Sequence, residues 1–113
     1  MMIVKERLPF ADLSRMAAQT FGDMVKAVVD VDRQLLAVDA ELHSDLEALL
    51  LEDGSLQKSL WGINLYPDMP ADQCIEFDSM INVRPSQGNR SRAVEDEAIR
   101  KRIAALVEQR LIR

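Results

Sequence analysis

Two neighbouring runs of alternating apolar residues constrain the fold more than any other feature of this sequence. Alternation with a period of two is typical of strands, and β-branched residues favour that conformation. A turn at residues 32–33 would pair Val29 with Leu36 and Lys26 with Asp39. Directly opposed residues share a face, so this register directs the apolar residues of both runs to one side and predicts an antiparallel hairpin. Those residues are Val25, Ala27, Val29, Leu36, Val38 and Leu42.

A second pair of strands is expected in the middle of the chain. Trp61, Ile63 and Leu65 alternate with small or polar residues, and another alternating segment runs over residues 75–84. In that segment we expect one face to carry Ile75, Phe77, Ile81 and Val83, and the other to carry Glu76, Asp78, Met80, Asn82 and Arg84. Residues 3–5 could add a short first strand.

Helical spacing and capping signals predict three helices. The first begins at Pro9 and ends at Gly22, and a capping box formed by Ser44 and Glu47 starts the second. Asp96 is a good N-cap for the last helix, which carries an apolar stripe. We therefore predict a single α+β domain over residues 1–113. Its mostly antiparallel sheet would have four to five strands from two hairpins, with about three helices packed on one face.

Composition places the chain among ordinary globular proteins. It has 113 residues, of which 48% are hydrophobic and 29% are charged. The amino terminus lacks the apolar run of a signal peptide, and no apolar run could span a bilayer, so we expect a soluble cytoplasmic protein with no membrane contact. The net charge is −5, no reading motif for nucleic acid is present, and a nucleic-acid partner is therefore disfavoured.

The charge is distributed unevenly along the chain. Residues 1–83 carry 6 Lys and Arg against 15 Asp and Glu, whereas residues 84–113 carry 8 against 4. The basic segment could attract an anion, or it could neutralise the acidic part of the fold. Cys74 is the only cysteine and is expected to be a small buried residue, which excludes an intrachain disulfide and a thiolate zinc cluster.

The loop after the second pair of strands is the first candidate site, for a phosphate- or carboxylate-bearing ligand. It contains three arginines and several amide and hydroxyl donors within nine residues: Arg84, Gln87, Asn89, Arg90, Ser91 and Arg92. Guanidinium forks match such anions bidentately, and Gly88 would allow close approach of the backbone. However, acidic residues 95–97 already occupy the positive end of the following helix. In the alternative interpretation these arginines pair with the acidic part of the chain and link the strand to the last helix.

The polar side of the sheet is the second candidate. Alternation collects acidic groups, an imidazole and a phenol there, and these groups could perform acid–base chemistry or ligate a metal. The set is Asp30, Glu41, His43, Asn64, Tyr66, Glu76, Asp78 and Asn82. The candidates for catalysis are His43, Glu41, Asp30, Asp78 and Glu76. A water-facing sheet surface is polar in any case, so we assign no metal ligands and no particular cofactor, and whether the protein is an enzyme stays open.

The same side of the sheet could instead be an oligomer interface. Val28, Leu35, Ala37 and Met80 interrupt its polarity, and a small domain with such a face often gains stability as a symmetric homodimer. A structural, homo-oligomeric protein without a ligand is therefore a third possibility.

Nearly the whole chain resembles a family of short prokaryotic proteins catalogued only as a domain of unknown function. The segments that carry this resemblance are MVKAVVDV (24–31), ELH (41–43), EALLLEDGS (47–55), WGINLYP (61–67), IEFDSMINVRP (75–85) and QGNRS (87–91). The resemblance implies one compact domain and brings no activity, cofactor or catalytic residue. The leading functional prediction is thus an anion-binding module at residues 84–92, and the alternatives are the enzyme and the structural protein described above.

Overall fold

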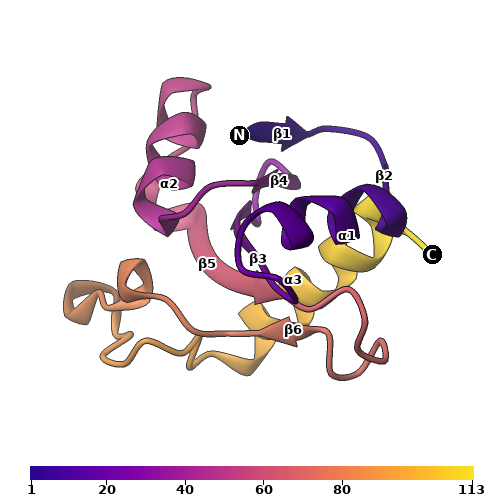
Figure 1. The fold of residues 1–113 in the computed structure, drawn as a ribbon. Coiled ribbons are helices and arrows are strands. Elements are labelled where there is room, and N and C mark those ends of the chain that lie inside the picture. The colour runs from indigo at the N-terminus through magenta and orange to yellow at the C-terminus, as the bar shows by residue number, and fades with distance from the viewer.

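A five-stranded antiparallel sheet forms the centre of the computed structural model, which describes all of residues 1–113 (Figure 1). The strand order is β1-β4-β3-β5-β6, and β2 and β7 form a separate parallel pair. The strands are β1 (Met2–Val4), β2 (Leu8–Pro9), β3 (Val25–Asp30), β4 (Leu35–Val38), β5 (Leu60–Leu65), β6 (Ile75–Glu76) and β7 (Leu111–Ile112). The helices are α1 (Phe10–Gln19), α2 (His43–Glu52) and α3 (Glu97–Arg110), with 3₁₀ turns η1 (Gln57–Ser59), η2 (Met80–Asn82) and η3 (Pro85–Gln87). The predicted α+β class is confirmed.

The β3–β4 hairpin has the predicted register, with Val29 opposite Leu36. Its turn is held by Asp30, whose Oδ1 accepts hydrogen bonds from the backbone amides of Asp32 and Arg33, both at 2.9 Å. A short side chain that caps the amides of its own turn can replace the Asn-Gly signature of a tight hairpin. The prediction for Leu42 is wrong, because β4 ends at Val38 and Leu42 lies exposed at the start of α2.

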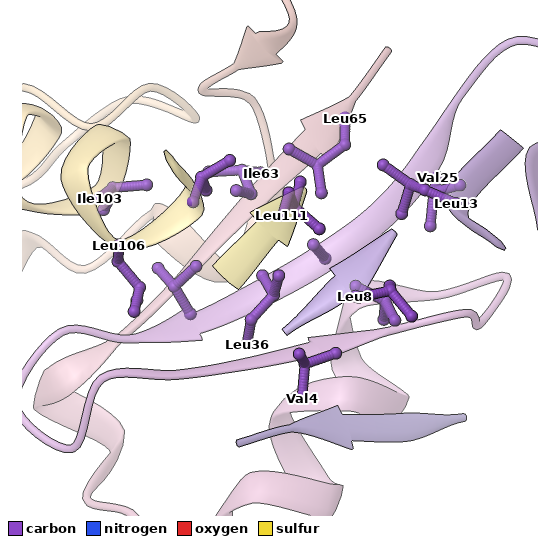
Figure 2. Packing of buried hydrophobic residues seen from close by; sticks show 14 of the residues in the cluster. Val4, Leu8, Leu13, Val25, Leu36, Ile63, Leu65, Ile103, Leu106 and Leu111 are labelled. Carbon is purple, nitrogen blue, oxygen red and sulfur yellow. The ribbon is translucent and has the colours of Figure 1, made fainter. Parts of the chain in front are cut away.

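The main core lies between one face of the sheet and helices α1 and α3. Figure 2 shows its side chains, which come from the strands as well as from both helices. Alternate residues of β3, β4 and β5 meet Leu13 and Ala17 of α1 and Ile103 and Leu106 of α3. Because each buried aliphatic side chain of this size contributes roughly 1.5–3 kcal/mol, this cluster supplies much of the stability of the fold.

Helix α2 covers the opposite face of the sheet, so the prediction that all helices pack on one face is wrong. Leu46 and Leu50 of α2 pack on Val28, Leu35 and Ala37, which point away from the main core. These three strand residues had suggested a dimer interface, and the chain buries them itself. The apolar residues on a mainly polar face therefore mark the position of a covering helix.

The predicted strand over residues 75–84 is largely wrong, because β6 ends at Glu76 and the chain then turns through η2. Met80 and Val83 are exposed, and Asn82 is completely buried. Asn82 takes the place of a strand partner for β5: its Oδ1 accepts from the amide of Gly62 at 2.8 Å, and its Nδ2 donates to the Gly62 carbonyl at 3.0 Å. Hydrogen bonds from a side-chain amide follow no periodic pattern in the sequence, so alternation of apolar residues could not reveal them.

The ends of the helices agree only in part with the sequence. Asp96 caps α3 as predicted, accepting a hydrogen bond from the amide of Ala98 at 2.8 Å. The capping box is wrong, since α2 begins at His43 and no side chain caps it. Because α2 has no side-chain cap, burial of Leu46 and Leu50 on the sheet is what stabilises this helix.

Candidate functional site

The three arginines of the loop at residues 84–92 have different environments. Arg84 is buried and directs its guanidinium into the fold, where it donates to the backbone carbonyls of Ile81 at 2.9 Å, Gln57 at 2.7 Å and Leu60. It also stacks over the Trp61 ring at 4.6 Å, and its burial lowers the pKa of the guanidinium. Arg84 thus joins the loop to the start of β5 and presents no free fork at the surface.

Asn89 has a similar internal role. Its Nδ2 donates to the carbonyls of Asn82 and Ala93, each at 2.7 Å, and its Oδ1 accepts from the amide of Glu95 at 2.9 Å. This buried side chain ties the loop to the segment that precedes α3. Gln87 and Ser91 are exposed, and both hydrogen-bond within the chain.

The backbone amides of the loop already hold a carboxylate. Oε2 of Glu95 accepts from the amides of Arg90 and Ser91, both at 2.7 Å. Hydrogen bonds from Ser91 and Arg90 lower the pKa of Glu95, so the group stays ionised. The loop has the geometry of an anion nest, and the chain supplies its own anion. The sequence signal for this contact is a Glu three residues beyond the polar, Gly-containing loop of residues 84–92.

Arg92 connects the loop to the polar side of the sheet. Its Nε donates to Oδ1 of Asp78 at 2.6 Å, and this bond raises the pKa of the guanidinium. Its terminal nitrogens, Nη1 and Nη2, make no hydrogen bond, and 55% of the side chain is exposed. Arg90 is also exposed, and its guanidinium has no partner. Arg92, which was predicted for the anion site, is therefore in direct contact with Asp78, which was predicted for the polar side of the sheet.

The part of the polar face next to Asp78 is well ordered by hydrogen bonds. Asn64 donates from Nδ2 to Oε1 of Glu76 at 2.8 Å and to the carbonyl of Asp78 at 3.3 Å, and the Tyr66 hydroxyl bonds the same Glu76 oxygen at 3.2 Å. Burial, together with the charge of Glu76, raises the pKa of Tyr66. Lys26 of β3 lies directly opposite Asn64 in the sheet.

His43 lies at the edge of this cluster. Its Nε2 is 2.8 Å from the carbonyl oxygen of Ile63, and because a carbonyl only accepts, Nε2 carries the proton. Burial lowers the pKa of the imidazole, and the charges of Asp78 and Arg92 also act on it. His43 is therefore neutral near pH 7, with Nδ1 left as an acceptor that no protein group uses.

The remaining members of the second predicted site do not join this cluster. Asp30 is buried at the other end of β3, four residues or roughly 13 Å from Lys26. Glu41 is exposed and makes no hydrogen bond or ion pair. Nowhere in the chain are three or more His, Cys, Asp or Glu residues arranged to hold a metal ion. The arrangement therefore places the fixed guanidinium of Arg92 and the neutral imidazole of His43 near the hydrogen-bonded carboxylates of Asp78 and Glu76.

Fold and site together define a small α+β domain with a polar surface where residues 78–92 meet the sheet. The chain belongs to the DUF5674 family, which is described as proteins of unknown function, and the family model matches residues 2–110. Comparison with curated proteins found no match, and comparison with solved structures found none either. None of the three helices is both long enough and apolar enough to cross a membrane.

Proposed function

We propose that the protein is a binding module for a small molecule bearing a phosphate or carboxylate group, which it holds on the guanidinium of Arg92. The observation that carries the proposal is the way Arg92 is fixed. Asp78 orients the guanidinium through Nε alone, and Nη1 and Nη2 remain free to bind two oxygens of one anion. A fork that is oriented in advance loses less entropy on binding than a mobile side chain.

Neighbouring groups support a ligand with more than an anionic group. Arg90 supplies a second exposed cation on the same loop, and Lys26 lies on β3 opposite Asn64, with its Nζ 5.3 Å from the centre of the Phe21 ring. Nδ1 of His43 can accept a hydrogen bond from a hydroxyl or amide of the ligand. The best fit is therefore a hydroxylated or amide-bearing phosphate or carboxylic acid. Arg84 and Asn89, which the sequence placed in this site, act from within by holding the loop in shape.

The test compares three variants of the full chain in a thermal-shift titration with inorganic phosphate, hydroxy acids and sugar phosphates. Arg92→Gln removes the fork, Arg92→Lys keeps the charge without the fork, and Arg15→Gln is the matched control. Arg15 is also an exposed arginine paired with a carboxylate, that of Asp12, but it lies on α1. A hydrogen bond to a charged group contributes about 1.5–3 kcal/mol, so Arg92→Gln should weaken binding by roughly tenfold or more.

Arg92→Lys should give an intermediate affinity, because lysine offers a point charge without a planar fork. The control variant should bind like the wild type. Unchanged binding in Arg92→Gln, or an equal loss in Arg15→Gln, would contradict the proposal.

A further inference from the structure

A cleft of about 360 Å³ opens on another part of the molecule, between α3, the start of α1 and residues 71–75. Its floor is formed by Cys74, Val107 and Leu111, all of which are buried, and Phe10 and Ile75 form its walls. These residues come from segments far apart in the sequence. None of them belongs to the surface around Arg92, so the two sites can be tested separately.

The size of the cleft suits a small ligand. Its volume equals that of about twelve water molecules at roughly 30 Å³ each. It falls within the range of about 300–1,000 Å³ that is usual for small-molecule sites, and such sites have mostly apolar walls with a few polar groups, as this one does. An apolar body of roughly a dozen non-hydrogen atoms would displace that water from the Phe10 and Val107 side chains.

The rim of the cleft carries the charges that select the ligand. Asp72 and Glu108 are exposed there, and neither carboxylate forms an ion pair. The one cation of the rim, Arg113, already stacks over the Phe10 ring with its guanidinium carbon 4.3 Å from the ring centre. The two unpaired carboxylates therefore favour a positively charged group above an apolar floor.

From this geometry we propose that the cleft binds a small amphiphilic amine, with the apolar body on Cys74, Val107 and Leu111 and the ammonium group between Asp72 and Glu108. The proposal concerns a second ligand and does not depend on the anion site. It commits to an amine over an alcohol or an acid of the same shape, because only the amine complements the charge of the rim.

The experiment uses 4-phenylbutylamine, 4-phenylbutanol and 4-phenylbutyrate, which share one apolar body and differ in charge. Affinity is measured by thermal shift, and the position of binding is reported by Cys74, the only cysteine of the chain. The amine is expected to bind roughly fivefold more tightly than the alcohol, the size of effect that an exposed ion pair gives. The acid should bind most weakly. Saturating amine should slow alkylation of Cys74 by iodoacetamide.

Two sets of variants test separately how the apolar body and the charge of the ligand contribute to binding. Ala104→Phe places a ring in the cleft from an exposed position on α3 and should abolish binding. Ala98→Phe makes the same change at an exposed position of α3 outside the cleft and should have no effect. The double variant Asp72→Asn/Glu108→Gln should bind the amine no better than the alcohol.

Several results would overturn the proposal. They are an absence of binding by all three compounds, an affinity for the acid that equals or exceeds that for the amine, and amine binding that persists in Ala104→Phe. An unchanged rate of Cys74 alkylation at saturating amine would place the ligand elsewhere and would have the same consequence. Loss of phosphate binding in Arg92→Gln has no bearing on these outcomes.

Discussion

Replacing Asn82 by alanine should strongly destabilise the protein. The side chain is completely buried and makes three hydrogen bonds. It accepts from the amide of Gly62 at 2.8 Å, and it donates to the carbonyls of Gly62 at 3.0 Å and Arg92 at 2.9 Å. In Asn82→Ala the amide and the carbonyl of Gly62 would lose these partners, whereas the Arg92 carbonyl would still accept from the amide of Ser79 at 3.0 Å.

The magnitude follows from the cost of leaving buried polar groups unpaired. Each such group costs about 1–3 kcal/mol, so the two backbone groups of Gly62 together amount to roughly 2–6 kcal/mol. An unfolding entropy of about 2 cal/mol/K per residue converts 3 kcal/mol into a fall of roughly 12 °C in Tm for a chain of 113 residues. Total stabilities of small domains are about 5–15 kcal/mol, so a loss of this size is a large fraction of the stability of the fold.

The assay is equilibrium unfolding in urea and by heat, with Gln109→Ala as the control. Gln109 is an exposed amide on α3 without a side-chain hydrogen bond, and its removal should change stability by less than about 0.5 kcal/mol. Hydrogen exchange gives a second readout, because the amide of Gly62 should lose its protection before the rest of β5. A loss below about 1 kcal/mol in Asn82→Ala would refute the claim that this side chain completes the edge of β5.

Further substitutions test the other elements of the account. Gly62→Ala should cost about 1–3 kcal/mol in chemical unfolding, because its Cβ would lie 2.5 Å from Cβ of Ser79, and wild-type stability would contradict this close approach. His43→Gln keeps a donor to the Ile63 carbonyl and removes the titrating group. Burial lowers the folded-state pKa of His43, so the unfolded chain takes up the proton first and the wild type should lose stability relative to the variant as pH falls below 6.5; parallel pH profiles would contradict this. Glu95→Ala should be stabilised by added acetate more than the wild type is, because acetate can occupy the amides of Arg90 and Ser91, and an equal response to acetate and chloride would argue against an anion nest.

Local patterns in the sequence predicted those parts of the fold that rest on repeated apolar side chains. The β3–β4 hairpin, the start of α1 and the cap of α3 at Asp96 follow from alternation, helical spacing and a single capping residue. Each of these signals lies within a short window of sequence. Val28, Leu35 and Ala37 also carried the information that a helix covers the second face of the sheet, but apolar residues on that face had suggested an interface between chains.

Contacts made through side-chain amides and guanidinium groups could not be predicted in this way. Asn82 and Arg84 are buried because they satisfy backbone groups of residues 57–62, and Met80 is exposed because η2 turns it outward. An alternating pattern over residues 75–84 therefore gave the wrong faces. The parallel pairing of β2 with β7 joins the two ends of the chain over only two residues each, too few for any periodic signal.

The arrangement of the candidate site could not be predicted from the sequence. The sequence places three arginines in residues 84–92, but only Arg90 and Arg92 present their guanidinium groups to solvent. The sequence pattern places Asp30 and Asp78 on one face of the sheet. In the structure Asp30 lies at one end of β3, and Asp78 lies near the other end. The contact of Arg92 with Asp78 depends on the path of the chain after β6, which no local pattern specifies.

The most direct test of the central claim is an NMR titration of the Arg92 side chain with inorganic phosphate. The claim is that Asp78 holds Nε while Nη1 and Nη2 bind the anion. We expect a saturable shift of the Arg92 side-chain resonances, larger than that of Arg15, with the Nε hydrogen still bonded to Asp78 throughout. A linear, unsaturated change of equal size at both arginines would show general ionic screening and would contradict a binding site at Arg92.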